Sequence, residues 1–194
     1  HGKEKGFDKA FADTVGSGRW YYFTVDLGPD ELVSKVKYLV QACGCRWIVI
    51  DHLHDIVANY GGSDERRFID QLMAQLKSIF VRFDIGVFLV TQLSLPEGNK
   101  GFEHGLAVTM KAIKGAGSIS QVSAVILGYE RNLMDAQKAK IGRLRVIKNR
   151  HGGRTGPADN LFYEESSGRL RVLGEHDFKD ESGGDAEEGE APPI

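Results

Sequence analysis

Polar side chains follow three apolar runs of this 194-residue chain, at positions where they can do chemistry. The runs cover residues 47–50, 85–90 and 124–129, and the side chains after them are Asp51-His52, Thr91-Gln92 and Glu130-Arg131. Ligands of open parallel sheets bind outside the carboxyl ends of the strands, which makes these positions the first candidates for a site. Mg²⁺ keeps several waters and needs only one or two carboxylates beside phosphate oxygens. Asp51 is therefore a candidate Mg²⁺ ligand in a nucleotide site.

The same stretch, residues 51–55, also has the composition of a zinc or two-metal hydrolase site. Its Asp-His-Leu-His-Asp order offers a His-x-His pair flanked by carboxylates. A catalytic zinc would need a third anchoring ligand, and the later histidines lie in Gly-rich or charged segments without paired spacing. A metallohydrolase is kept as an alternative. Cys43 and Cys45 lack a second Cys or His pair, so they fit small buried residues before a strand better than a zinc site.

Two basic segments can bind an anion. Residues 111–118 combine lysines, including Lys114, with Gly115 and Gly117, and glycines let a backbone approach a phosphate closely. The alternative is an ordinary loop before a helix. A second cluster covers residues 145–154, where strand alternation predicts that Lys148 and Arg150 share one face. For this cluster the alternative is a solvated sheet edge.

The elements that must position these residues follow from hydrophobic periodicity. Strands are predicted over residues 21–25, 47–50, 86–91 and 124–129, the last three as continuous apolar runs. Helices are predicted from Pro29 to about Val40 and after Ser63-Asp64-Glu65, where apolar residues recur from Phe68 to Phe83. Later strands at 144–148, 161–165 and 169–173 alternate in polarity. The pattern indicates an α/β fold with a mostly parallel sheet flanked by helices and a C-terminal antiparallel extension.

Composition limits the function classes. No apolar run approaches the roughly 20 residues that span a bilayer, and two cysteines cannot form a disulfide framework, so we expect a cytoplasmic protein without membrane contact. Residues 174–194 hold eight acidic side chains and one lysine. This leaves 24 basic and 19 acidic side chains in residues 1–173. We therefore expect one folded, mildly basic part over 1–173 and a disordered acidic tail over 174–194.

Taken in order, these motifs resemble the RecA-like motor domain of replicative ring helicases. The phage primase-helicase type is the most similar, with bacterial DnaB and mitochondrial Twinkle as relatives. The resemblance spans about residues 25–173 and rests on six ordered segments. They are 47–52, 63–66, 88–93, 114–118 with Gln121, 130–132, and 146–150 followed by Thr155-Gly156.

The resemblance implies a role for each motif. Asp51 corresponds to the Walker B carboxylate that holds the Mg²⁺ shell, and Gln92 to the sensor of the γ-phosphate, where phage relatives often have histidine. Arg150 corresponds to the arginine finger that reaches a neighbouring subunit's nucleotide, with Lys148 as its companion. Gln121 and Arg131 correspond to residues that couple the nucleotide site to the DNA-binding loops. The DNA-binding loops correspond to residues 94–105, in which Lys100 alone is basic, and to residues 114–117 with Lys114, Gly115 and Gly117.

One family motif is absent from the sequence. No Gly-x-x-x-x-Gly-Lys-Ser/Thr string occurs, although a P-loop needs one to cradle phosphates, and the segment around Gly16 and Gly18 is too short. In the family the P-loop lies upstream of the matching region. We therefore interpret the chain as the C-terminal part of a helicase motor domain and expect this piece alone to be inactive.

The favoured function is the motor of a hexameric replicative DNA helicase. It would use ATP or another NTP or dNTP, with Mg²⁺, to translocate on single-stranded DNA and unwind duplex DNA at a replication fork in a bacterial or phage-infected cell. The acidic tail is expected to dock a DNA polymerase. Two alternatives stay open: a RecA-like recombinase ATPase, and a non-catalytic module that binds DNA or a polymerase.

Overall fold

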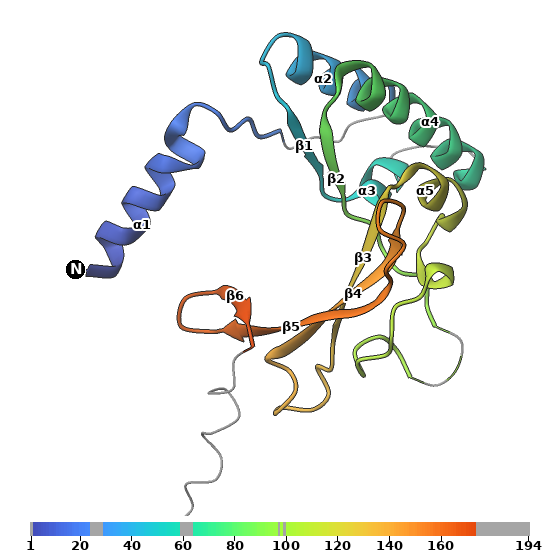
Figure 1. Cartoon of the computed structure of the whole chain (residues 1–194). Helices are drawn as coiled ribbons and strands as arrows, with labels where there is room; N and C mark the ends of the chain where they lie inside the picture. The colour runs from blue at the N-terminus through green and yellow to red at the C-terminus, as the bar shows by residue number, and fades with distance from the viewer. Residues whose placement is uncertain (1, 24–28, 59–63, 97, 99, 174–194) are drawn as a thin grey trace, which may run out of the picture. The chain divides into compact units, whose positions relative to one another are not determined.

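The computed structural model describes residues 2–23, 29–58, 64–96, 98 and 100–173. The chain forms two compact units (Figure 1). The first comprises His1–Ser94 with Met110–Ser123, and the second comprises Leu95–Thr109 with Ala124–Ile194. The predicted acidic tail at 174–194 lies outside the described residues.

The sheet of the first unit has two parallel strands, β1 (Trp47–Ile50) and β2 (Gly86–Leu89). Both were predicted, although β2 ends two residues earlier than expected. Ile48 and Ile50 are buried, whereas Trp47 and Val49 are more than half exposed. The helices predicted to flank the sheet therefore cover one face of β1, and its other face is exposed within the described residues. On the other face, the Trp47 ring lies over Gly86, where a Cβ atom would clash with it.

Helices pack beside this strand pair (Figure 1). They are α2 (Pro29–Gln41), α3 (Leu53–Ala58), α4 (Glu65–Phe83) and α5 (Ala116–Val122), while α1 (Gly2–Asp13) and the short 3₁₀ turns η1 (Val15–Ser17) and η2 (Met110–Ala112) complete the unit. α4 begins as predicted, because the side chain of its N-cap Asp64 accepts the Arg67 N–H at 3.0 Å. Its apolar face is confirmed and provides much of the core, through Phe68, Ile69, Leu72, Met73, Leu76 and Ile79. Burying each such side chain contributes about 1.5–3 kcal/mol.

The predicted strand at residues 21–25 is not found. Residues 21–23 have no regular structure, and residues 24 and 25 lie outside the described part. Tyr21, Tyr22 and Phe23 are 45%, 75% and 39% exposed. Aromatic residues fit a strand only where a neighbouring strand and a covering layer are available, so β propensity alone did not decide the conformation.

The second unit is a four-stranded antiparallel sheet in the order β3–β4–β5–β6. Its strands are β3 (Val125–Arg131), β4 (Ile141–Asn149), β5 (Gly156–Glu164) and β6 (Arg169–Val172). The predicted antiparallel pairing of the C-terminal strands is confirmed, but within the described residues these strands form a sheet of their own and do not extend the β1–β2 pair. β3, however, was expected in the parallel sheet and instead pairs antiparallel with β4. The connection between them is too short for a crossover helix, which a parallel neighbour would need. The described part therefore has two parallel and four antiparallel strands, and the predicted parallel majority is wrong.

None of the helices in the described ranges is long and apolar enough to cross a membrane.

Candidate functional site

The ends of β1 and β2 lie together in the first unit. Asp51 directly follows β1, and Gln92 comes three residues after β2. The Val90 N–H donates to the Ile50 carbonyl at 2.9 Å, and the Leu53 N–H donates to the Val90 carbonyl at 3.0 Å. The backbone thus continues the strand pairing up to the two predicted site residues. Asp51 is exposed and can meet a ligand.

His52 connects the two strand ends through side chains. Its Nε2 lies 3.1 Å from the side-chain nitrogen of Gln92, and its Nδ1 accepts the Asp55 N–H at 3.2 Å. A neutral imidazole that accepts at Nδ1 carries its proton on Nε2. The oxygen and nitrogen of a glutamine amide exchange by a half-turn, so hydrogen bonding to His52 requires Gln92 to present its oxygen. The NH₂ group of Gln92 can then donate a hydrogen bond to a phosphate oxygen.

His54 holds the backbone of the same glutamine. It lies on α3 and is 5% exposed, and its Nδ1 accepts the Gln92 N–H at 3.3 Å. Burial lowers the pKa of His54, and the nearby positive charge of Lys114 acts in the same direction. A neutral ring suits this contact, because protonated histidine has no acceptor.

The candidate DNA-binding loop at residues 114–117 is joined to the Gln92 segment. The Lys114 N–H donates to the Gln92 carbonyl at 3.1 Å, and the Ser94 N–H donates to the Ala112 carbonyl at 2.7 Å. An antiparallel bridge between Leu93 and Ile113 lies between these bonds. Together they make a short ladder, 92–94 with 112–114, which we call the sensor ladder. It places the predicted sensor and the predicted loop in direct backbone contact.

The side chain of Lys114 pairs with Glu65 at the start of α4, with 2.9 Å between Nζ and Oε1. Both side chains are nearly half exposed, so a competing anion can reach them. Gly115 has φ +75°, and a Cβ atom there would lie 3.1 Å from the Ile69 side chain. This position therefore needs glycine for its backbone conformation. Gly117 is exposed and Gln121 lies on the exposed part of α5.

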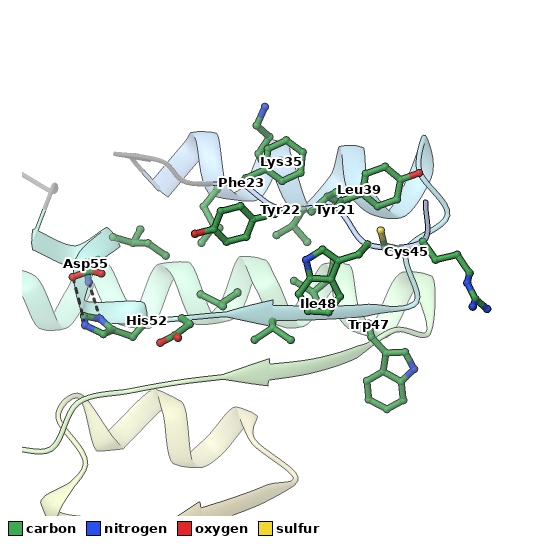
Figure 2. Close-up of a pocket in the computed structure, with 18 residues that line it drawn as sticks. Tyr21, Tyr22, Phe23, Lys35, Leu39, Cys45, Trp47, Ile48, His52 and Asp55 are labelled. Atoms are coloured by element: carbon green, nitrogen blue, oxygen red, sulfur yellow. Dashed lines mark hydrogen bonds and ion pairs between the residues drawn. The ribbon is translucent and has the colours of Figure 1, made fainter. Parts of the chain in front are cut away.

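A pocket of about 780 Å³ lies beside β1, and Asp51, His52 and Asp55 line its polar end. Figure 2 shows His52 and Asp55 side by side, and it shows the aromatic side chains at 21–23 near Lys35 of α2. The Lys35 ammonium lies 4.7 Å from the centre of the Phe23 ring. The pocket thus combines an aromatic wall with a carboxylate-bearing end.

The metal-ligating side chains at this site favour a metal ion that binds together with a phosphate ligand. The described residues contain no group of three His, Cys, Asp or Glu side chains able to hold a metal ion alone. The zinc alternative for residues 51–55 loses support for a second reason, because His54 uses Nδ1 for Gln92. A single exposed carboxylate at Asp51 fits Mg²⁺ held mainly by phosphate oxygens and water.

The predicted finger residues lie at the end of β4 in the second unit. Lys148 pairs with Ile126 of β3, and Arg150 follows the last residue of the strand. Arg150 is exposed, and its N–H donates to the Ala124 carbonyl at 2.9 Å. The side chain of Asn149 accepts the backbone N–H groups of His151 and Gly152, two and three residues further on, each at 3.1 Å. This closed turn fixes the position of the Arg150 backbone.

Lys100 and Arg131 also belong to the second unit. Lys100 is exposed in the 94–105 loop, whose later part is fixed to the end of β3 by a bridge between His104 and Asn132. Arg131 donates through Nε to the Ala139 carbonyl at 3.0 Å, and its guanidinium lies 5.6 Å from the Tyr163 ring centre. These contacts give Arg131 a structural task in the β3–β4 connection, and its coupling role stays a prediction.

Sequence reasoning did not predict the partners of three polar side chains. Glu65 was expected as a helix start within the 63–66 motif, His54 as an alternative metal ligand, and Glu130 as a polar residue at a strand end. Glu130 is 5% exposed and accepts the Val108 N–H at 2.9 Å and the Arg145 Nε–H at 2.6 Å. Their partners are distant in sequence, so spacing carried no signal for them.

The comparison with protein families decides the assignment. The model of the DnaB-like helicase C-terminal domain matches residues 22–169. The chain belongs to this DnaB-like family. Among its relatives, the DNA helicase/primase of Enterobacteria phage T3 is 30% identical over 166 residues, which cover 84% of this chain and 29% of that protein. A probable plasmid replicative DNA helicase of Chlamydia psittaci is 26% identical over 125 residues, 63% of this chain and 27% of that protein.

Solved structures of similar fold include a DnaB-like replicative helicase, described together with its interactions with primase. It matches with a TM-score of 0.56 at 17% identity, over 76% of this chain and 35% of that one. A KaiC-like protein of Pyrococcus horikoshii matches with a TM-score of 0.52 at 14% identity, over 75% of this chain and 57% of that one. The fold is thus shared with DnaB-like and KaiC-like proteins. The chain spans less than a third of the length of the phage and plasmid relatives.

Proposed function

We propose that this DnaB-like chain is part of the motor of a replicative ring helicase, which hydrolyses ATP or another NTP or dNTP to move along single-stranded DNA. The observation that carries the proposal is the sensor ladder. Through it, Gln92, which lies beside the Asp51–His52 turn, bonds directly to Lys114 of the candidate DNA loop. Such a connection suits a motor because it joins a nucleotide sensor to a nucleic-acid grip.

Asp51 would hold Mg²⁺ through its water shell, and Mg²⁺ when bound neutralises charge on the phosphates. Gln92 would donate its amide NH₂ group to a γ-phosphate oxygen. His52 would support this orientation, because with the amide turned by a half-turn its Nε2–H would donate to the amide oxygen of Gln92. Asp51 and Gln92 would thus bind and orient the nucleotide, and the sequence holds no P-loop string to add to them.

Arg150 would complete the nucleotide site of a neighbouring subunit, with Lys148 beside it, in a homo-hexamer. A guanidinium stabilises the charge that develops during phosphoryl transfer. The exposed position after β4 and the Asn149-closed turn support this role, because a finger needs a fixed backbone and an accessible side chain.

Lys114, Gly115 and Gly117 in the first unit, and Lys100 in the second, would contact the DNA backbone without reading its sequence. Gln121 and Arg131 would transmit the nucleotide state to these loops. The acidic tail would bind a DNA polymerase at the replication fork. Each of these roles is a proposal.

The experiment uses the longest reading frame that contains this chain, purified as a ring. We expect Mg²⁺-dependent NTP hydrolysis that single-stranded DNA stimulates and that Asp51→Asn abolishes, together with unwinding of a forked duplex. Asp70→Asn, which removes the same charge from an exposed position on α4, is the matched control and should retain most activity. DNA binding without NTP hydrolysis would instead support a non-catalytic module. Strand exchange without unwinding would support a recombinase.

A further inference from the structure

Gln92 is held through both its backbone N–H and its backbone carbonyl. On one side its N–H points to Nδ1 of His54 at 3.3 Å, and on the other its carbonyl accepts the Lys114 N–H at 3.1 Å. The contact to His54 spans 38 positions in sequence, so it joins two otherwise separate segments. The sensor ladder therefore has an anchor on α3 as well as a partner in the DNA loop.

His54 makes this contact from inside the protein. The side chain is 5% exposed, and within the described residues its Nε2 has no hydrogen-bond partner. Within the described residues the ring thus makes its hydrogen bond through Nδ1. Gln92 itself is exposed and this hydrogen bond is partly buried, so without the ring nitrogen the Gln92 N–H would lose its tie to α3 and exchange with solvent more readily.

Resting on the proposed function, we propose that His54 is a positioning residue that anchors the sensor ladder, and with it Gln92 and Lys114, to the helix that follows the Asp51–His52 turn. It touches neither nucleotide nor DNA. Without the anchor, a shift of Lys114 on DNA binding would still reach Gln92 through the ladder, but Gln92 would no longer be held beside Asp51, and DNA binding would no longer change the rate of hydrolysis.

Two substitutions separate the hydrogen bond from ring packing. In His54→Asn, the amide oxygen lies as many bonds from Cβ as Nδ1 does, so an acceptor is retained. In His54→Phe, the ring shape is retained and the acceptor is lost. Val57→Ala, at a 5%-exposed position on the same short helix, is the matched control that loosens α3 without removing a polar contact.

The first test is nuclear magnetic resonance of the ¹⁵N-labelled 194-residue chain. We expect a scalar coupling across the hydrogen bond between the Gln92 amide nitrogen and His54 Nδ1. Hydrogen exchange of the Gln92 amide should accelerate by about tenfold or more in His54→Phe and stay near the original rate in His54→Asn. An absent coupling, or equal acceleration in Val57→Ala, would overturn the assignment.

The second test measures DNA-stimulated NTP hydrolysis by the longer reading frame. His54→Phe should lose about tenfold of the stimulation while the nucleotide KM without DNA stays near that of the unsubstituted protein, and His54→Asn should restore the stimulation. Full stimulation in His54→Phe, or the same loss in Val57→Ala, would overturn the coupling role. Absence of hydrolysis in the unsubstituted protein would overturn the proposed function. The scalar coupling of the first test would still show whether His54 holds the Gln92 amide, so the two failures can be told apart.

Discussion

Lys114 and Glu65 form an ion pair, with 2.9 Å between the lysine Nζ and the glutamate Oε1. The lysine that the sequence assigns to DNA therefore has a carboxylate partner within its own unit. An incoming phosphate must replace that partner, and an exposed pair of this kind is worth only about 0–1 kcal/mol. The pair is weak enough for nucleic acid to displace it.

We predict that Glu65→Gln strengthens single-stranded DNA binding by up to about fivefold at low salt, the equivalent of about 1 kcal/mol. Fluorescence anisotropy with a labelled oligonucleotide checks this. Asp70→Asn removes the same charge from an exposed position on α4 and is the control. If both variants gain affinity equally, net charge rather than the release of Lys114 explains the effect.

The lysines themselves give a second prediction. Replacing Lys100 and Lys114 together by alanine should weaken binding to every sequence alike and reduce the salt slope by about one or two ions. The measurement is a titration at several salt concentrations. An unchanged slope would assign both lysines to solvated surface.

The two glycines of the loop should differ. Gly115→Ala places a Cβ at φ +75° and 3.1 Å from Ile69, so it should distort the loop at a cost of about 1–2 kcal/mol and weaken DNA binding. Gly117→Ala meets only the tip of Arg66 at 3.9 Å and should be tolerated. Circular dichroism confirms folding before binding is compared. Equal losses in both variants would contradict the conformational argument.

The pH dependence of stability should report His54. Burial lowers its folded-state pKa below the ordinary value, with Lys114 and His52 acting in the same direction and Glu65 and Asp55 opposing. As the pH falls, His54 therefore takes up a proton in the unfolded chain before it does so in the folded chain. The stability that neutral His54 contributes is present above about pH 6.5 and is lost as the pH falls through the lower folded-state pKa. Urea unfolding should show a shallower loss below pH 6.5 in His54→Asn. An identical pH profile would contradict it.

Helix α4 illustrates what the sequence alone could predict. Its apolar residues recur at the helical period, and Asp64 provides a local cap, so both its start and its buried face follow from neighbours in sequence. The apolar run of β1 and the polar Asp51 that follows it are also neighbours in sequence, so both could be predicted. Local patterns also predicted that Asp51 and Gln92 belong to neighbouring strand ends.

Other features depend on contacts between distant residues. The hydrogen bond from Gln92 to His54 and the ion pair of Lys114 with Glu65 each join separate elements. Neither leaves a periodic or compositional trace, so a histidine and a helix-starting glutamate received other interpretations. The pairing of β3 was also misassigned, because an apolar run is compatible with either strand direction.

In the proposed motor, Asp51 of one subunit and Arg150 of the next act on the same nucleotide. Arg150→Ala should leave nucleotide binding nearly intact and lower turnover by about 10³-fold or more. Arg150→Lys should not restore it, because an ammonium lacks the planar fork.

The most direct measurement mixes Asp51→Asn and Arg150→Ala subunits of the longer reading frame in varied ratios and follows NTP hydrolysis. Some interfaces of a mixed ring pair an intact Asp51 with an intact Arg150, so hydrolysis should rise above the sum of the two separate variants and peak at intermediate ratios. If native mass spectrometry confirms mixed rings and hydrolysis never exceeds that sum, Arg150 does not act on a neighbouring subunit's nucleotide and the account is contradicted.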